Sequence, residues 1–482
     1  MDPEKTSQTD SNGTGNSESH VQIYERPRGF KGLYSHPITQ TCMLGLVCFM
    51  GPGLFNALNG LGGGGQLDPT TSANANAILY GTFAFFAFFA GTINNRLGAK
   101  VTLLLGTTGY SLYVAGYLVL NIHPHAGAFL LTAGAILGAC AGLLWTAQGS
   151  LMLAYPTEAQ KGKFIGLFWC IFNLGAVVGA CVSLGQNFNS KSNVVSNGTY
   201  IGFLILTLIG VCIPLLMVSP ENIVRTDGTR VALVRHPSWK IELYGLWVAL
   251  RTDPLIVLLF PMFFASNWFY AWQFNDFNDA FFNIRARSLN NLVYWLSQMV
   301  GSIAIGALLD RGSISRRARA FSGWVVLFVM VFVVHIWGFF YQRQYTRASF
   351  PPGVDVVKMD IFDKGYAGRI IIYIFCGLLD AMWQTMSYWI MGAMSNDPSK
   401  LAYFAGFYKS IQSAGGAGSW RADGVKTPFM NMFISTWTLL VAGLLFALPM
   451  IHLRVKNQTD LADETLLRMD DSGKIRDVGQ EN

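Results

Sequence analysis

The sequence is poor in charge. Only 13% of its 482 residues are Asp, Glu, Lys or Arg, whereas 52% are hydrophobic, and the mean hydropathy is +0.36. An average soluble domain carries about 25% charged residues, and an apolar excess over so long a chain would leave patches that a water-exposed surface does not tolerate. This composition excludes a soluble enzyme, a disordered regulator and a nucleic-acid-binding protein. It indicates a membrane protein with many spans.

Paired cysteines, a signal peptide and catalytic motifs are also missing. The first 36 residues are polar and lack the apolar core of a cleavable signal peptide, so we expect a disordered tail and a first span that itself directs insertion. No catalytic triad, HExxH zinc site or nucleotide loop is present, which predicts a protein that is not an enzyme and holds no cofactor or metal. No disulfide is expected, because every cysteine falls in an apolar run: Cys42, Cys48, Cys140, Cys170, Cys181, Cys212 and Cys376.

The sequence is rich in apolar runs of about 20 residues, the length that a helix needs to cross the hydrocarbon core. Lipid offers no partner for backbone N–H and C=O groups, so each run should be helical. Twelve runs qualify: 38–60, 73–94, 100–121, 126–152, 163–185, 200–219, 254–275, 289–309, 320–342, 367–393, 399–419 and 428–451. They predict an all-α membrane protein with twelve transmembrane helices in two six-helix bundles.

The expected domains follow from the long polar interval in the middle of the chain. They are a disordered tail at 1–36, a first bundle at 37–219, a linker at 220–253, a second bundle at 254–452, and a tail at 453–482. Within the linker, residues 238–252 place Trp and Leu side chains on one helical face with basic residues nearby. This pattern predicts an interfacial helix that joins the two bundles.

Basic residues set the expected orientation. Roughly two thirds of the 34 lysines and arginines lie in the tails and loops on the side of the two termini, and half of those on the opposite side come from 343–369 alone. Short cytoplasmic loops carry such an excess, so both termini are expected in the cytosol, at the plasma membrane or an endomembrane. Asn197 is then the only outer sequon and the expected glycan acceptor, whereas Asn12 and Asn457 fall inside.

The two halves contain a repeated loop. Residues 91–100 read GTINNRLGAK between spans 2 and 3, and residues 306–317 read GALLDRGSISRR between spans 8 and 9. Aligning the two loops places Arg96 with Arg311, and Asn76 with Asn291 further along the preceding helix. Repeated helical units are typical of transporters, whose substrate site lies at the interface of the repeats.

The 6+6 layout and these loops resemble the major facilitator superfamily, whose loop pattern is G-x-L-A-D-R-x-G-R-K. The matching residues are Gly91, Arg96, Gly98 and Lys100 in the first copy and Gly306, Asp310 and Arg311 in the second. The resemblance implies that the acid of this pattern pairs with neighbouring helix ends and holds one state of a transport cycle. Asn95 replaces that acid in the first copy, so only Asp310 keeps a charged lock.

A narrower resemblance covers about 37–452. Residues 51–65 (GPGLFNALNGLGGGG) and 168–175 (FWCIFNLG) are similar to fungal members of the Unc-ninety-three-like branch. This resemblance implies one of two functions. The first is secondary transport of a small molecule or ion by alternating access, in one version proton-coupled. The second is a non-transporting partner of another membrane protein, as an ion-channel regulatory subunit or a trafficking chaperone. In either case the chain contacts the lipid bilayer and no nucleic acid.

Two charged residues lie in the middle of predicted spans, where an ionisable side chain is costly and by default indicates function. Asp380 is in span 10 and Lys409 in span 11, and because these spans are consecutive and antiparallel, the two side chains are expected to meet. In the functional interpretation, they line a central cavity for proton coupling or for a charged substrate. In the alternative, they form an ion pair that only fixes helix register, and breaking it costs about 3–5 kcal/mol.

Neutral polar residues in other spans are expected to line the same pathway. They are Asn56, Asn59, Asn76, Gln148 and Asn173 in the first half and Gln298, Gln384 and Gln412 in the second. The alternative for each one is an interhelical hydrogen bond, worth about 0.6 kcal/mol in membranes. Gly62–Gly65 is interpreted as a flexible hinge, because no Lys-Ser/Thr follows it as in a phosphate-binding loop. His335 is interpreted as a hydrogen-bonded core histidine.

Overall fold

The computed structural model describes residues 24–157, 160–231, 239–252, 254–351, 354–394 and 398–457, and two short strands beyond them. The helices of the first half are α1 (Phe30–Tyr34), α2 (Pro37–Cys48), η1 (Phe49–Gly53), α3 (Leu54–Gly60), η2 (Gly63–Gly65), α4 (Pro69–Leu97), α5 (Ala99–Ile122), α6 (Gly127–Ala154), α7 (Lys161–Asn187), α8 (Asn197–Leu216) and η4 (Pro220–Asn222). Those of the second half are α9 (Trp239–Thr252), η5 (Pro254–Leu259), α10 (Phe260–Ala265), η6 (Ala271–Asp279), α11 (Ile284–Leu309), α12 (Arg316–Gln342), α13 (Tyr366–Met394), α14 (Pro398–Gly424) and α15 (Phe429–Arg454). Strands β1 (Arg468–Met469) and β2 (Ile475–Arg476) pair antiparallel.

Within the described residues, ten helices are long and apolar enough to cross a membrane. The first of them runs through α2, η1 and α3, and the π-helical segment η1 accommodates Pro52 inside it. The other two expected spans differ from these ten. The run at 254–275 is divided among η5, α10 and η6, and α14 is a long helix of lower apolar content that carries charged residues.

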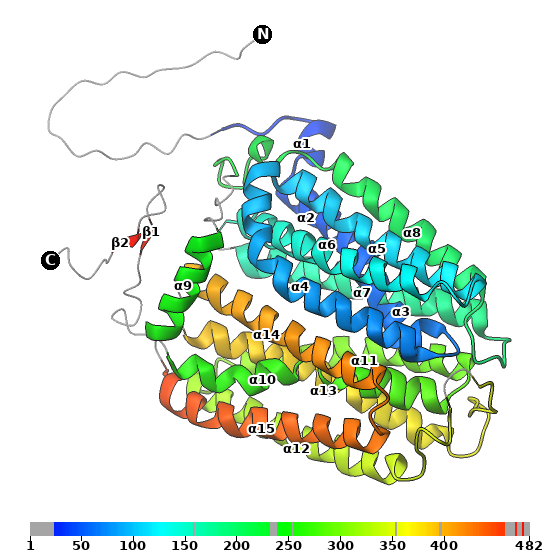
Figure 1. The fold of residues 1–482 in the computed structure, drawn as a ribbon. Helices are drawn as coiled ribbons and strands as arrows, with labels where there is room; N and C mark the ends of the chain where they lie inside the picture. Colours follow the sequence, from blue (N-terminus) through cyan, green and yellow to red (C-terminus); the bar gives the residue numbers. More distant parts are fainter. Residues whose placement is uncertain are drawn as a thin grey trace, which may run out of the picture.

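Buried apolar side chains form two large clusters. One cluster is built almost wholly from α2–α8, and the other almost wholly from η5–α15. Figure 1 shows the same division, with the blue to teal helices on one side and the yellow-green to red helices on the other. Helix α4 packs against α14, and α7 packs against α11, so these two pairs join the halves.

Small residues allow the helices inside the first half to approach closely. A Cβ atom on Gly175 of α7 would lie 2.4 Å from the carbonyl oxygen of Phe49, and one on Gly179 would lie 2.7 Å from the Cβ atom of Ala57. Both distances are shorter than van der Waals contact. The backbones of α7 and of the first span can therefore touch only because these positions carry no side chain.

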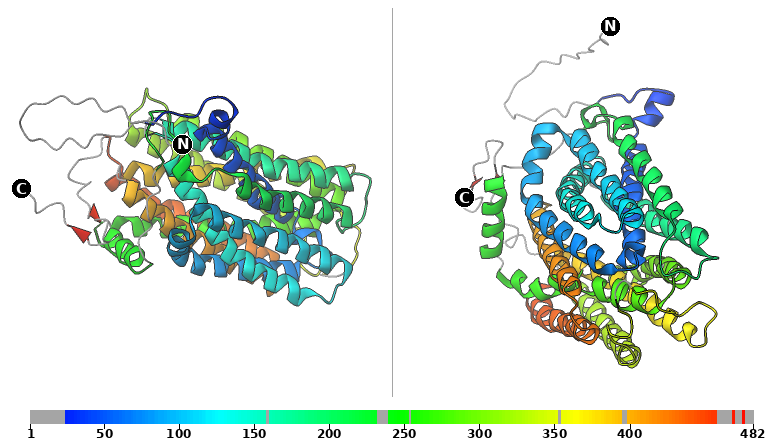
Figure 2. Two further views of the ribbon diagram at one scale, coloured as in Figure 1. Left: turned by 90° about the horizontal axis from the view of Figure 1, so that it is seen from above. Right: turned by 45° about the vertical axis from the view of Figure 1, so that its right-hand side comes forward.

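Helix α9 and the end of α15 lie at one end of the helices, which we call the Asp310 end, and the opposite end is the Arg287 end (Figures 1 and 2). Helix α9 packs beside α4, where the Trp239 backbone N–H donates to the Thr92 hydroxyl at 3.1 Å. Trp239 and Trp247 are 38% and 61% exposed, as expected for a helix that meets a bilayer surface. Ser238, its expected first residue, lies outside the described residues.

Part of the expected 36-residue N-terminal tail has a defined structure. The described chain begins at Tyr24, whose N–H donates to the Gly228 carbonyl at 2.8 Å, and the Arg26 guanidinium donates to the Arg225 carbonyl at 3.1 Å. These contacts attach the segment to the hairpin that follows α8. Residues 1–23, which include Asn12, lie outside the described residues.

Candidate functional site

Asp380 lies in the middle of α13 and is 1% exposed. Three donors approach its carboxylate. The Tyr294 hydroxyl donates at 2.9 Å and the Gln298 amide at 2.5 Å, both from α11, and the Gln384 amide lies 3.4 Å away. These donors stabilise a carboxylate that is buried from solvent. The predicted Asp380, Gln298 and Gln384 are therefore brought together in one cluster.

Lys409 does not contact Asp380, contrary to the expected charge pair. Its ammonium donates to the Gln412 Oε1 atom at 2.9 Å and lies over the rings of Tyr388 and Tyr408, 5.6 and 5.3 Å from their centroids. Among the described residues, no carboxylate lies within ion-pair distance of this ammonium. The aromatic faces supply part of the stabilisation that the carboxylate was expected to give.

Helix geometry explains why the two charges stay apart. Gln412 is as far from the start of α14 as Asp380 is from the end of α13, so these two residues lie at about the same depth in the antiparallel helices. Lys409 lies three residues earlier, about 4.5 Å along the axis. Two glutamines fill the interval, because the Gln412 amide donates to the Gln384 Oε1 atom at 2.8 Å. The result is a continuous hydrogen-bonded chain from Lys409 through Gln412 and Gln384 to Asp380.

The polar residues of the first half form a smaller group. The Asn76 amide donates to the Asn59 Oδ1 atom at 3.2 Å, and the Tyr113 hydroxyl donates to the Asn76 Oδ1 atom at 2.8 Å. The other predicted members are not brought into this network. Within the described chain, we find no hydrogen bond that involves the side chains of Asn56, Gln148 or Asn173.

At the Arg287 end, the halves are joined by a fully buried arginine. Arg287, near the start of α11, is 0% exposed. Its guanidinium donates to three backbone carbonyls of the first half: Leu61 at 2.7 Å, Gly62 at 2.5 Å and Asn193 at 2.9 Å. It also forms an ion pair with Asp279 of η6 at 2.7 Å. The planar fork of arginine suits such divergent acceptors, and the contacts fasten the two halves together here.

Asparagines of the second half extend this junction. The Asn278 amide donates to the Gly60 carbonyl at 2.9 Å, the Asn291 amide donates to the Ala57 carbonyl at 2.6 Å, and the Asn275 Oδ1 atom accepts from the Gly63 N–H at 2.6 Å. All four glycines of Gly62–Gly65 have positive φ. The predicted hinge is thus a fastened loop in this structure, and its glycines allow both its conformation and the close approach of η6.

Cations of the 343–369 segment complete the Arg287 end. Arg347 forms ion pairs with Asp276 at 3.3 Å and Asp423 at 2.5 Å, and the Lys358 ammonium lies 3.5 Å from the Asp279 carboxylate. Burial lowers the pKa of Lys358, and the charge of Asp279 opposes that effect. The excess of cations in this segment is unusual for an outer loop. Two of these cations, Arg347 and Lys358, are explained by their ion pairs with buried aspartates.

The repeated loops lie at the Asp310 end and are exposed. Asn95 and Arg96 lie in the last turn of α4, Gly98 has a φ of 77°, and the Lys100 ammonium donates to the Met217 carbonyl at the end of α8, at 2.7 Å. Asp310 is exposed as well, and no described cation lies within ion-pair distance of it. Gly91 and Gly306 lie near the ends of α4 and α11, and Arg311 follows α11. Asp310 thus makes no ion pair with another described residue in this conformation.

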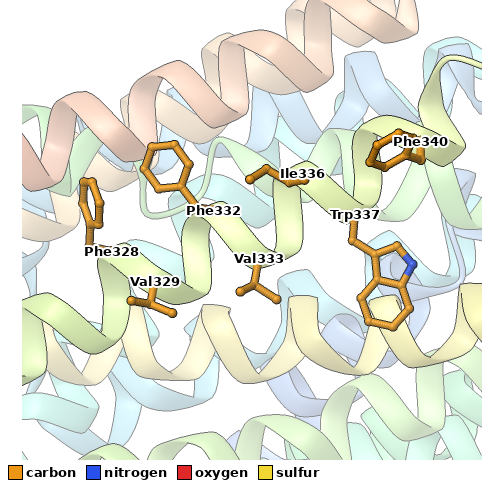
Figure 3. A pocket seen from close by; sticks show the side chains of 7 residues that line it. All are labelled: Phe328, Val329, Phe332, Val333, Ile336, Trp337 and Phe340. Carbon is orange, nitrogen blue, oxygen red and sulfur yellow. The ribbon is translucent and has the colours of Figure 1, made fainter.

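An apolar groove on α12 lies apart from these polar groups. Its volume is about 570 Å³, and it is lined by Phe328, Val329, Phe332, Val333, Ile336, Trp337 and Phe340. Figure 3 shows Phe332 toward α15 and Trp337 toward α13. The Phe332 ring lies 5.8 Å from that of Trp437, and the Trp337 ring 6.0 Å from that of Phe375. Such an exposed apolar helix face suits contact with lipid.

The other predictions on single residues have simple outcomes. His335 is buried, and its ring Nδ1 atom lies 2.7 Å from the Val331 carbonyl oxygen, as expected for a hydrogen-bonded core histidine. Asn197 is exposed at the start of α8 and accepts from the Asn121 amide at 2.7 Å. All seven cysteines are free. Among the described residues, no group of three or more His, Cys, Asp or Glu side chains is arranged to hold a metal ion.

Sequence reasoning missed the residues of the Arg287 end. Asp276, Asp279 and Arg287 follow an apolar run and so read as loop residues, although all three are buried. Two signals could have found them. One is the polar stretch 272–279 (WQFNDFND), and the other is the excess of cations at 343–369, which opposes the usual charge bias of outer loops.

Comparisons with known proteins identify relatives over most of the chain. Residues 65–446 match the model of the family described as "Ion channel regulatory protein UNC-93". An UNC93-like protein of Schizosaccharomyces pombe is 47% identical over 441 residues, which cover 91% of this chain and 87% of that protein. UNC93-like protein 1 of Arabidopsis thaliana is 39% identical over 433 residues, with 89% and 93% of the two chains covered.

Two solved structures show the fold. A D-xylose–proton symporter superposes with a TM-score of 0.60 at 14% identity, covering 89% of this chain and 100% of that one. The Escherichia coli xylose transporter XylE, in a partially occluded inward-open conformation, gives a TM-score of 0.59 at 15% identity over 87% and 98% of the chains. Together with the sequence relatives, these likenesses show that the chain belongs to the UNC-93 family and has the fold of major facilitator transporters.

Proposed function

We propose that this protein is a secondary transporter that carries a small molecule or ion by alternating access. Its twelve spans would form two six-helix bundles, 37–219 and 254–452, which rock about a site between them. The Arg287 end would face away from the cytosol and the Asp310 end toward it. The contact of Arg287 with three carbonyls of the other half is the observation that carries this proposal, because it is a closure that can break and re-form as a unit.

The two ends of the molecule differ as a closed and an open side would. Backbone carbonyls, asparagines and ion pairs join the halves at the Arg287 end. At the Asp310 end, the repeated loops are exposed, and Asp310 has no cationic partner among the described residues. This difference supports an inward-facing state, in which the charged lock of the second repeat is released. Asn95→Ala should therefore matter less than Asp310→Asn, which removes the lock that the opposite state needs.

The chain of hydrogen bonds from Lys409 to Asp380 is our candidate for the substrate or coupling site. It contains one negative and one positive group at mid-membrane depth, separated by two amides that can both donate and accept. Burying such groups in the membrane costs free energy, and ionisable groups at this depth are typical of substrate and ion pathways. The side chains of Asn56, Gln148 and Asn173 make no hydrogen bonds in the described chain, and they would face the same pathway from the first half.

A reversible cross-link between the halves tests alternating access. The hydroxyl oxygens of Ser183 in α7 and Ser288 in α11 lie 3.1 Å apart at the Arg287 end. A Ser183→Cys/Ser288→Cys variant should form a disulfide that holds this end closed. Transport is measured in liposomes that contain a pH-sensitive dye, with panels of isotope-labelled sugars, amino acids and nucleosides outside. Oxidation should abolish uptake, and dithiothreitol should restore it.

A pair within one half provides the control. The Ser302 and Thr385 hydroxyl oxygens lie 3.3 Å apart on α11 and α13, both in the second half. Oxidising Ser302→Cys/Thr385→Cys should leave uptake unchanged, because no relative motion is needed there. Undiminished uptake through the cross-linked Ser183/Ser288 variant would refute alternating access about this interface.

The second candidate function is a regulatory partner of an ion channel, which the description of the family suggests. Asn95 favours this candidate, because it removes the acid of the first repeat. A regulator would take up none of the labelled solutes, and a channel that purifies with it would change conductance when it is removed. Those two results together would replace the transporter proposal.

A further inference from the structure

Two buried carboxylates at the Arg287 end share a single nitrogen atom. The Arg347 Nη2 atom lies 3.3 Å from the Asp276 Oδ1 atom and 2.5 Å from the Asp423 Oδ1 atom. Asp276 belongs to η6 and is 0% exposed, while Asp423 belongs to α14 and is 3% exposed. The two carboxyl groups therefore lie close together, because an oxygen of each approaches the same nitrogen. Two carboxyl oxygens can hydrogen-bond to each other only if one of them carries a proton.

The charges around this pair do not balance two ionised carboxylates. Arg347 provides one positive charge for both. The nearest other acid, Asp279, already has Arg287 and Lys358 as partners, at 2.7 and 3.5 Å. The Tyr345 hydroxyl donates to the backbone carbonyl of Asp276 at 2.8 Å and not to its carboxylate. Two carboxyl groups in one buried site cannot both ionise without a large cost in free energy, so one proton should remain on the pair.

The hydrogen bonds indicate which oxygen holds that proton. Asp423 is satisfied as an anion, because its Oδ1 atom accepts from Arg347 and its Oδ2 atom accepts from the Asn275 amide at 2.6 Å. The Asp276 Oδ2 atom is buried and has no hydrogen-bond partner among the described residues. As a bare anionic oxygen it would be strongly unfavourable, whereas as a hydroxyl it could donate to Asp423.

Asn275 links this pair to the closure between the halves. Its amide nitrogen donates to Asp423, and its Oδ1 atom accepts from the Gly63 N–H of the first half at 2.6 Å. The charge of the pair is therefore one side chain away from the fastened glycine loop. We propose that Asp276 and Asp423 together bind one proton, and that this proton is the coupling ion, whose binding keeps the Arg287 end closed and whose release opens it.

This assignment rests on the proposed function, but it can be tested without a known substrate. The rate at which Ser183→Cys/Ser288→Cys cross-links reports the fraction of molecules closed at the Arg287 end. Cross-linking rates are measured from pH 5 to pH 9 and divided by those of Ser302→Cys/Thr385→Cys, which removes the pH dependence of thiol oxidation itself. The ratio should fall as pH rises, by up to about tenfold per pH unit for one linked proton.

Single substitutions identify the proton site. Asp276→Asn keeps a donor toward Asp423 and removes the titrating oxygen, so the ratio should stay high at every pH. Asp423→Asn leaves one carboxylate for one guanidinium, and the ratio should again not change with pH. A flat wild-type profile, or a slope that survives in both variants, would overturn the proton assignment. If one variant fails to fold, the other still gives the answer.

Metal cations are tested with the same assay. Replacing sodium by N-methylglucamine at fixed pH should leave the ratio unchanged. A ratio that depends on sodium in the wild type and not in Asp276→Asn would assign the pair to a metal cation instead. A pH-dependent ratio without any solute uptake would support the proton site and contradict transport, whereas uptake with a flat ratio would do the reverse.

Discussion

Gly62 and Gly98 have almost the same backbone conformation in very different surroundings. Their φ angles are 76° and 77°. A Cβ atom on Gly62 would lie 2.1 Å from the carbonyl oxygen of Phe274, in the other half of the chain, whereas one on Gly98 would meet nothing within 4 Å. Gly62 therefore serves two purposes, a left-handed turn and a close contact with η6, and Gly98 serves only the first.

Alanine at the two positions separates these purposes. Gly98→Ala should lower stability by about 1–3 kcal/mol, the cost of a positive-φ conformation that only glycine adopts readily. Gly62→Ala should cost more and should also slow the Ser183→Cys/Ser288→Cys cross-link, because the added atom holds η6 away from the loop. Unfolding temperature in detergent and the cross-linking rate are the measurements. Equal effects of both changes would mean that contact with η6 is unimportant.

Single residues could be predicted from the sequence where lipid makes their type unusual, as for a charged residue in an apolar run. Asp380 stands out because it is charged within an apolar run, and in the structure it is buried with polar partners. Arg287 is buried just as deeply but lies beside polar residues in the sequence. Its partners are backbone carbonyls, which have no signature in the amino-acid sequence. The partner of Lys409 was also missed, because a shift of one helical turn decides it.

At the scale of elements, the first span begins with an unusual cap. The His36 Nδ1 atom accepts a hydrogen bond from the Ile38 N–H at 3.1 Å, at the start of α2. Partial burial, with a smaller contribution from the charge of Arg26, lowers the pKa of His36. A protonated Nδ1 atom could not accept this bond, so the cap requires the neutral ring.

The cap therefore predicts a pH dependence of stability. Folded His36 binds a proton less readily than the unfolded chain does, so acidification below about pH 6.5 should favour unfolding. Unfolding temperatures between pH 7.5 and pH 5 should fall less steeply for His36→Asn, which keeps a capping oxygen without a titrating ring. His123→Asn, at an exposed loop position, should retain the wild-type slope. An identical slope in all three proteins would rule out the cap as a titrating element.

Hydrophobic length predicts most elements well, but it fails where polar groups are buried in number. Ten helices of the described chain match expected spans, because lipid permits only one secondary structure for an apolar run. Residues 271–279 depart from the pattern. Their π-helical segment buries Asn275, Asp276, Asn278 and Asp279 together, and the hydrogen bonds of these side chains to other segments decide the local conformation.

For the whole molecule, the charge bias predicts a definite topology. Asn197 and Asn457 lie at opposite ends of the helices, the second beside Arg317 at the Asp310 end. Antibodies should reach tags on both termini once the plasma membrane has been permeabilised, because both tags lie in the cytosol. In intact cells the tags should not be labelled. Glycosidase treatment should change the mobility of the wild type but not of Asn197→Gln. Termini on opposite faces would contradict the model of twelve spans.

The contacts of Arg287 also bear on how the protein is made. Its bonds to Leu61 and Gly62 join residues 226 and 225 positions apart. During synthesis, the carbonyls of the loop after the first span therefore lack their Arg287 partner until the second half of the chain has entered the membrane. A nascent or truncated chain would present this glycine-rich stretch unfastened. Quality-control factors of the membrane could distinguish finished molecules from incomplete ones at this loop.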